Sequence, residues 1–149
     1  VGSNYCILRT SWVVSPHGTN FVKTMLNLSD NRDTLSLITD QIGGPTPAKD
    51  IAKACLQIVE QLKQEPSKSG TYHFSGTEDV SWADLATEIF QQTRRSMRVI
   101  PIPTCHFPTP AVRPLNSRLN CSQTEKVFSI HRPDWRIGLN HILTELGVV

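Results

Sequence analysis

The sequence predicts a mixed α/β fold, and three features of the chain support this. A nearly continuous run of apolar and β-branched residues, Tyr5 to Val14, is typical of a strand buried on both faces of a parallel sheet. Segments with helical spacing of apolar residues then alternate with short strand-like runs. The last part of the chain carries helical patterns only. With 149 residues, the chain is long enough for one domain with a hydrophobic core.

The first forty residues are predicted to form a strand, a helix and a second strand. The opening apolar run is interrupted at residues 9–11. Asn20 is a suitable cap for a helix that continues through Leu28, because the apolar residues of that segment recur at helical spacing. A short strand is predicted over residues 35–39.

The next segment, residues 40–47, contains two glycines and two prolines and is predicted to be a turn. Thr46 is expected to cap the following helix with Pro47 at its first position. The spacing of apolar residues after this turn predicts a helix with one apolar face. The residues of that face are Ile51, Ala54, Cys55, Ile58, Val59 and Leu62. Residues 64–70 form a polar loop, and residues 71–75 alternate like a strand.

Two capping signals mark the helices of the second half. Ser81 and Asp84 are spaced as a capping box before a helix that extends to about Thr93. A strand over residues 98–102 follows, ended by Pro103. Ser122 and Glu125 have the same spacing as a capping box before a short helix.

The last helix is predicted to begin after Asp134 and to end near Gly147. Its apolar residues share one face; they are Leu139, Ile142, Leu143 and Leu146.

The composition excludes several classes of protein. The net charge of +2 is too small for a nucleic-acid-binding surface, and no apolar run is long enough to cross a membrane. The four cysteines form no closely spaced pair, which favours reduced thiols in a cytoplasmic protein, although their even number permits disulfides. No signal peptide is recognisable at the first residues.

Several catalytic and cofactor motifs are missing from these residues. The sequence contains neither a G-x-G-x-x-G loop nor a P-loop, and neither of its two tyrosines has a lysine four residues later. No histidine or cysteine spacing predicts a metal site. Cys105 and His106 are adjacent, but adjacency in sequence is weak evidence for a nucleophile and its base.

The segment from residue 108 to residue 119 is the strongest candidate for ligand binding. It holds three prolines, which stiffen it, together with Arg113, Asn116, Ser117 and Arg118. A guanidinium group can bind phosphate oxygens in a bidentate manner, and a stiff loop loses little entropy on binding. The segment is therefore interpreted as a phosphate clamp, with a proline-rich surface loop and solvated arginines as the alternative.

Two further residues precede turns at predicted strand ends. Trp12 could offer a flat apolar face to a sugar ring, since ligands bind beyond the carboxyl ends of parallel strands. Packing in the core is the alternative for Trp12. Gln41 could supply amide contacts, although the turn explains the neighbouring glycines by itself.

Taken in order, these fragments resemble the C-terminal portion of the dTDP-4-dehydrorhamnose reductase family, part of the extended short-chain dehydrogenase/reductase superfamily. The resemblance covers nearly the whole chain. In the first third it rests on Leu8-Arg9-Thr10-Ser11-Trp12-Val13, Asn20-Phe21-Val22-Lys23-Thr24-Met25-Leu26 and Asp40-Gln41-Ile42-Gly43-Gly44-Pro45-Thr46. Later it rests on Gly70-Thr71-Tyr72-His73-Phe74, Thr109-Pro110-Ala111, Arg113-Pro114-Leu115-Asn116-Ser117-Arg118-Leu119 and Pro133-Asp134-Trp135.

The resemblance implies the end of a Rossmann-type parallel sheet, about residues 1–40, and a smaller α/β substrate-binding lobe, about residues 41–149. The family reduces dTDP-4-dehydro-L-rhamnose to dTDP-L-rhamnose with NADPH. Its glycine-rich loop and Tyr-x-x-x-Lys pair would lie upstream of Val1, so the isolated chain is expected to be inactive and not to bind NADPH. A non-catalytic nucleotide-sugar-binding or regulatory module of the same superfamily is the alternative.

The resemblance also implies roles for individual residues. Trp12 would lie against the deoxysugar, with Gln41 and Thr46 near the site wall. The diphosphate or the nucleotide would meet Arg113, Asn116, Ser117 and Arg118. The family commonly has an aromatic residue where this chain has Val14, so one contact would be missing. A homo-oligomer formed through an exposed sheet edge or apolar surface is a further expectation.

Overall fold

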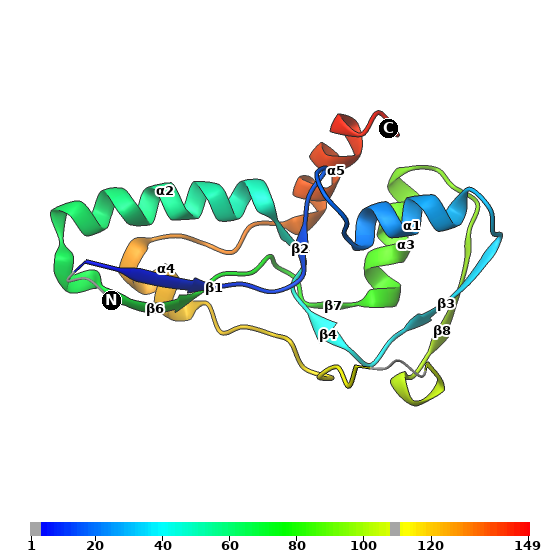
Figure 1. The fold of residues 1–149 in the computed structure, drawn as a ribbon, viewed down its shortest axis with the longest axis horizontal. Helices are drawn as coiled ribbons and strands as arrows, with labels where there is room; N and C mark the ends of the chain where they lie inside the picture. Colours follow the sequence, from blue (N-terminus) through cyan, green and yellow to red (C-terminus); the bar gives the residue numbers. More distant parts are fainter. Residues whose placement is uncertain (1–3, 108–110) are drawn as a thin grey trace.

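The computed structural model describes residues 4–107 and 111–149, and it confirms the α/β fold class (Figure 1). Two strand pairs run parallel: β1 (Cys6–Arg9) with β6 (Gly70–His73), and β3 (Thr34–Ile38) with β8 (Arg98–Ile102). The short strands β2 (Val13–Val14) and β5 (Thr46–Pro47) also run parallel. The antiparallel pair consists of β4 (Ile42–Gly43) and β7 (Val80–Ser81).

Five α-helices and two short 3₁₀ turns complete the described part of the chain. The helices are α1 (Phe21–Ser29), α2 (Ala48–Gln64), α3 (Trp82–Gln92), α4 (Ser122–Phe128) and α5 (Trp135–Glu145). The turns are η1 (Pro66–Lys68) and η2 (Thr104–His106). No helix of the described residues has the length and apolarity that crossing a membrane would require.

The opening strand differs from the prediction, because the run from Tyr5 to Val14 is two strands and not one. The chain turns at Trp12, whose φ of 48° lies in the left-handed region. Burial alternates along β1, and Ile7 is 45% exposed, so burial on both faces was wrong. The reason is that β1 has one hydrogen-bonded neighbour among the described strands, β6, and the buried side chains nearby lie toward α2 and α4.

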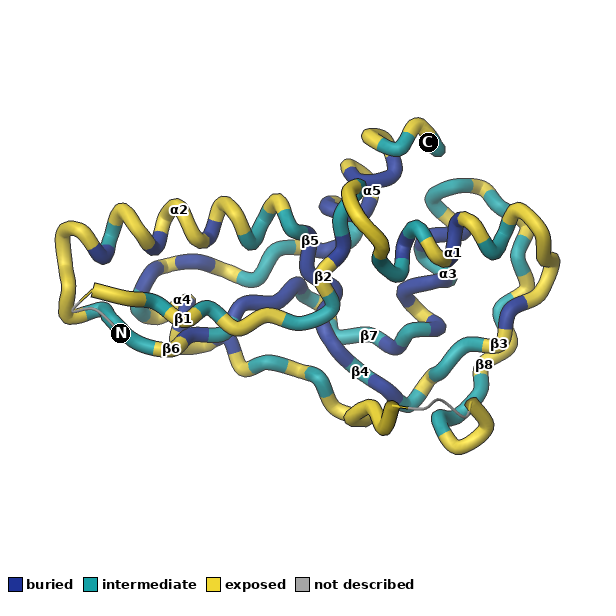
Figure 2. Tube along the Cα trace, in the orientation of Figure 1, coloured by how far each residue is buried: buried dark blue, intermediate teal, exposed yellow. Residues whose placement is uncertain are grey.

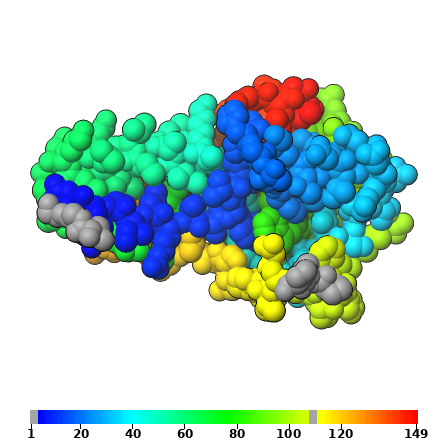
Figure 3. All heavy atoms as spheres, viewed as in Figure 1, coloured from blue at the N-terminus to red at the C-terminus, as the bar shows by residue number. Residues whose placement is uncertain are grey.

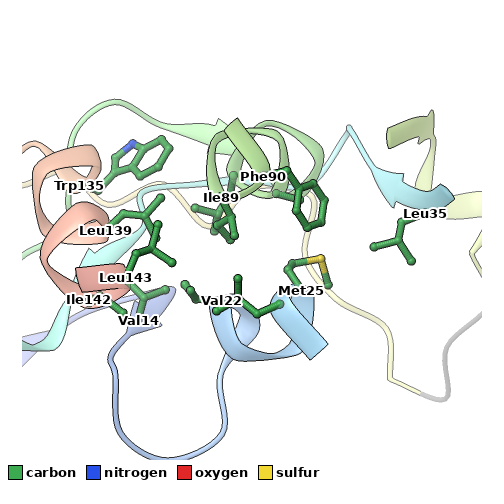
Figure 4. Packing of buried hydrophobic residues seen from close by; sticks show 13 residues of the cluster. Val14, Val22, Met25, Leu35, Ile89, Phe90, Trp135, Leu139, Ile142 and Leu143 are labelled. Carbon is green, nitrogen blue, oxygen red and sulfur yellow. The ribbon is translucent and has the colours of Figure 1, made fainter. Parts of the chain in front are cut away.

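The larger core cluster is formed mainly by α1, α3 and α5. Figure 4 shows Val22 and Met25 of α1 pointing toward Ile89 and Phe90 of α3. The side chains of α5 complete the cluster; they are Trp135, Leu139, Ile142 and Leu143. This cluster fixes α1 and α3 relative to each other, and both helices carry residues of the candidate site.

A second cluster joins α2 and α4 to the β1–β6 pair. Its buried members include Ala54, Ile58 and Leu62, which lie on one side of α2, as the sequence predicted (Figure 2). Cys55 and Val59 were expected on that face but are exposed. The buried stripe of α2 is therefore narrower than the predicted one. The larger cluster contains buried residues from before and after residue 40, and Cys6 and Leu8 pack against the second cluster.

The capping predictions divide into three that are confirmed and two that are wrong. Asn20, Ser81 and Asp134 accept hydrogen bonds from the first turns of α1, α3 and α5. Pro47 and not Thr46 is the N-cap of α2, and it makes no side-chain capping bond. Ser122 lies inside α4, whose N-cap is Cys121.

Candidate functional site

A stacked pair of tryptophans forms the centre of the candidate site. The rings of Trp12 and Trp82 lie parallel, with centroids 3.6 Å apart and planes 7° from each other. Gly43 makes room for this pair, because a Cβ atom there would lie 2.7 Å from Nε1 and Cε2 of Trp12. Phe21 of α1 packs on Trp82 at 4.6 Å between ring centroids. Aromatic side chains from the first 21 residues and from the start of α3 therefore meet at one place.

Gln41 links the tryptophan pair to the loop after β8. Its Oε1 accepts a hydrogen bond from Nε1 of Trp82 at 3.2 Å, and its Nε2 donates to Oγ1 of Thr104 at 3.2 Å. The residue is 4% exposed. Both ends of the amide are thus occupied, so Gln41 positions Trp82 and η2 relative to each other.

Asp40 fastens η2 to the end of β3. Its carboxylate accepts a 2.6 Å hydrogen bond from the Thr104 hydroxyl and two further bonds from the Thr104 backbone N–H. The hydroxyl bond is the main reason why the pKa of Asp40 lies below its usual value.

A groove with a volume of about 660 Å³ opens beside the tryptophan pair. It lies between α1 and β3, and it is lined at one end by Gln41, Trp82, Phe107 and Arg113. Trp12 is not among its lining residues and reaches it only through its contact with Trp82. The groove is largely apolar with few charged groups, which suits a ligand that combines an apolar ring with an anionic part.

The loop that contains Arg113 is anchored to β4. Leu115 O accepts a hydrogen bond from Ile42 N at 2.9 Å, and Ser117 N donates to Ile42 O at 2.8 Å. These bonds hold Arg113 at the end of the groove that contains Gln41. Pro108, Thr109 and Pro110, which belong to the proposed clamp, lie outside the described residues. Figure 3 shows the part of the loop after residue 110, in yellow, at the molecular surface.

The other candidate residues of this loop lie outside the groove. Arg118 donates from its backbone N and from Nη1 to Oδ1 of Asn116, at 3.1 and 3.3 Å. Arg118 and Asn116 are exposed, and Ser117 is half-buried. The structure therefore brings Arg113 to the groove and leaves these three residues outside its lining.

Thr46 has a structural position next to Trp12. Its hydroxyl donates toward Ser11 O and Gly44 O, both at 2.9 Å, and it accepts from Gly76 N at 3.2 Å. The residue is fully buried. The Thr46 hydroxyl thus links the backbone at Ser11, Gly44 and Gly76 next to the candidate site.

Several groove residues did not emerge from the sequence as site candidates. Trp82 and Phe21 follow helical spacing in their own segments, and this pattern predicts core packing and not a binding site. Phe107 and Arg32 are single residues in loops and carry no motif. The described residues contain no group of three or more His, Cys, Asp or Glu side chains that could hold a metal ion.

Comparison with known proteins decides the family. The family described as RmlD substrate binding domain matches residues 1–148. This chain belongs to that family. It is 44% identical to dTDP-4-dehydrorhamnose reductase of Sinorhizobium fredii over 149 residues, covering 96% of the chain and 50% of that protein. The corresponding enzyme of Aggregatibacter actinomycetemcomitans is 44% identical over 143 residues, covering 91% of the chain and 49% of that protein.

Solved structures of dTDP-4-dehydrorhamnose reductases have a similar fold. The dTDP-4-dehydrorhamnose reductase of Clostridium acetobutylicum superimposes with a TM-score of 0.85 at 36% identity, covering 96% of this chain and 49% of that one. The Bacillus anthracis enzyme in complex with NADP gives 0.80 at 34% identity, covering 95% and 48%. The RmlD-family chain described here therefore spans about half the length of the relatives it matches, and it has the Rossmann-type α/β architecture of these reductases.

Proposed function

We propose that this chain is the sugar-nucleotide-binding portion of a dTDP-4-dehydrorhamnose reductase, which reduces dTDP-4-dehydro-L-rhamnose to dTDP-L-rhamnose with NADPH. The observation that carries the proposal is the groove beside the stacked tryptophans, with the Arg113 side chain at its end. Membership of the RmlD substrate binding domain family supports the same ligand class. In the cell, we expect the protein in the cytoplasm.

The geometry supports a specific orientation of the ligand. The deoxysugar lies near the tryptophan pair, where an apolar ring face can pack on an indole. The diphosphate meets the guanidinium of Arg113, which can bind two phosphate oxygens at once. Asn116, Ser117 and Arg118 stand on the same anchored loop and would contact the outer phosphate oxygens. Gln41 and Thr46 are positioning residues: Gln41 holds Trp82 in place, and Thr46 holds Trp12.

We do not expect the residues present to bind NADPH by themselves. The sequence lacks both the glycine-rich loop and the Tyr-x-x-x-Lys pair that the family uses. One buried polar atom beside Trp12, Oγ of Ser11, has no hydrogen-bond partner among the described residues, but a single hydroxyl cannot hold a dinucleotide. Hydride transfer and protonation of the 4-keto group would therefore depend on polypeptide outside these 149 residues, and we expect the isolated chain to be inactive.

The proposal is tested by replacing Arg113 with Ala in the complete protein that carries this chain. The KM for the sugar nucleotide should rise roughly tenfold or more, because a charge-assisted hydrogen bond contributes about 1.5–3 kcal/mol. The KM for NADPH should change little. Arg94→Ala, at the end of α3 and outside the groove, is the matched control. Equal increases in both KM values would contradict the assignment of Arg113 to the sugar nucleotide.

A non-catalytic nucleotide-sugar-binding or regulatory module is the second candidate, since these residues lack the catalytic pair and the cofactor loop. The two candidates differ in one measurement. A reductase portion supports oxidation of NADPH by dTDP-4-dehydro-L-rhamnose in the complete protein, whereas a regulatory module binds the nucleotide sugar without turnover. Titration of the isolated chain with dTDP in a calorimeter completes the test. Micromolar binding by the isolated chain would contradict our expectation that the site needs further polypeptide.

A further inference from the structure

The groove extends well beyond Arg113, along α1 and β3. Helix α1 faces it with a stripe of side chains at helical spacing, among them Phe21, Met25 and Leu28. All five residues of β3, Thr34–Ile38, also line it. Side chains of a strand alternate between its two faces, so five consecutive lining residues indicate that backbone atoms of β3 also line the groove.

The two ends of the groove are chemically distinct and far apart. Phe21, Gln41 and Arg113 lie at one end, and Arg32, in the loop between α1 and β3, lies at the other. Helix α1 contains nine residues, which corresponds to about 13 Å at 1.5 Å per residue. A diphosphate group is shorter than this helix. We therefore assign Arg32 and Arg113 to different parts of a bound ligand.

Within the described part of the chain, both of these arginines are free to bind a ligand. Arg95, Arg132 and Arg136 each form an ion pair with a carboxylate. Within residues 4–107 and 111–149, no carboxylate lies within 4.0 Å of the guanidinium nitrogens of Arg32 or Arg113. The described lining of the groove holds these two cations and no aspartate or glutamate. The two cations are complementary to anionic or acceptor groups at two places on a ligand.

Resting on the proposed function, we propose that Arg32 recognises the base of the nucleotide and selects pyrimidines that carry an oxygen, and not an amino group, at C4. A sugar nucleotide is ordered sugar, diphosphate, nucleoside. With the sugar at the tryptophan pair and the diphosphate at Arg113, the nucleoside follows the apolar middle of the groove and its base reaches Arg32. A guanidinium only donates hydrogen bonds. It can pair with the O4 acceptor of thymine but is opposed by the N4 amino donor of cytosine.

The experiment compares dTDP, dCDP and inorganic pyrophosphate as competitive ligands of the sugar-nucleotide site in the complete protein. The unmodified protein should bind dTDP about tenfold more tightly than dCDP, the factor expected for one hydrogen bond to a charged group. Arg32→Met, which keeps the length of the side chain and removes its donors, should reduce this ratio to about one. Arg32→Lys should leave an intermediate ratio. Arg94→Met, after the end of α3 and outside the described lining of the groove, is the matched control and should change nothing.

Pyrophosphate distinguishes the two ends of the groove. Its binding should be weakened by Arg113→Met and left unchanged by Arg32→Met. The opposite result, or a dTDP-to-dCDP ratio that Arg32→Met leaves intact, overturns the role of Arg32 while the proposed function stands. Absence of dTDP binding in the unmodified complete protein overturns the proposed function itself. Thermal melting of each variant separates these outcomes from unfolding.

Discussion

At the scale of single residues, the site depends on a close fit between Gly43 and Trp12. Trp12 has a positive φ of 48°, which is costly for a residue with a Cβ atom. This conformation directs the chain from β1 into β2, while the stacking on Trp82 offsets part of the strain. The absence of a side chain at Gly43 is what lets the indole take its place.

Replacing Gly43 with Ala should disrupt the tryptophan pair. The added Cβ atom would lie 2.7 Å from Trp12, so the indole must move or the backbone must shift. We expect a loss of about 1–3 kcal/mol in the free energy of unfolding, as is usual for overpacking. Urea denaturation measures this loss, and near-ultraviolet circular dichroism should show a weakened signal from the stacked indoles. Trp12→Phe provides the reference spectrum without the pair. Unchanged stability and an unchanged spectrum in Gly43→Ala would contradict the fit described here.

Asp40 makes the stability of the fold depend on pH in the acid range. Because its folded-state pKa is lowered, Asp40 stabilises the fold above the unfolded value of about 3.9. That stabilisation disappears as the pH falls through the lower folded-state pKa. Thr104→Val removes the hydroxyl that donates to the carboxylate, so the pKa of Asp40 should rise toward its ordinary value.

The titration of the Asp40 carboxyl carbon, followed by NMR, measures this change. The loss of stability at acid pH should also become less steep in Thr104→Val. Thr87→Val is the control, because the Thr87 hydroxyl donates to Ala83 within α3 and does not contact Asp40. An unchanged Asp40 titration in Thr104→Val would show that another group lowers this pKa.

At the scale of helices and strands, two sequences with capping-box spacing behave differently. Ser81 and Asp84 exchange both capping bonds at the start of α3, where Trp82 is the first helical residue. Ser122 has the same spacing to Glu125 but lies one position inside α4. Thr124 of that helix is buried, and its hydroxyl bonds to His73 O of β6. This long-range bond joins α4 to β6, and α4 begins at Ser122, one residue earlier than the spacing predicts.

This difference predicts opposite results for two Ser→Ala substitutions. Ser81→Ala should lower the free energy of unfolding by about 1 kcal/mol, since it removes an N-cap. Ser122→Ala should leave it nearly unchanged, because the Ser122 side chain makes no capping bond. Urea denaturation of both variants measures the two effects under identical conditions. Equal losses in the two variants would contradict the assignment of Cys121 as the N-cap of α4.

At the scale of the whole molecule, the β1–β6 pair has an open side. β1 pairs with β6 alone among the described strands, and several large apolar side chains are exposed, including Ile7 on β1 and Leu56 on α2. An open strand edge with an apolar residue is a surface on which further strands or chains can add. In a protein with the length of the relatives, additional polypeptide is available to cover it.

We therefore expect the isolated 149-residue chain to self-associate at high concentration. Ile7→Lys places a charge on the open strand and should shift the chain toward the monomer. Ile137→Lys, on an exposed position of α5, changes the charge equally at another place and should have little effect. Light scattering and sedimentation measure the molecular mass of all three proteins. A monomeric unmodified chain at high concentration would contradict this expectation.

Local features of this protein were determined by its sequence. The spacing of apolar residues identified α1, α2, α3 and α5, and Asn20, Ser81 and Asp134 were correctly predicted as caps. These features depend on neighbours three or four residues away, which the sequence places on one helical turn. Trp12, Gln41 and Arg113 also stood out, since each follows a strand or lies in a stiff, proline-rich loop.

Only the tertiary structure decided how these residues combine. It stacked Trp12 on Trp82, joined Gln41 to both Trp82 and Thr104, and brought Arg113 but not Arg118 to the groove. It also ended the first strand at Arg9 and turned the chain at Trp12, whose φ is positive. Such contacts join segments that are remote along the chain, and they form only when the packing of whole helices and strands fixes the distance between them.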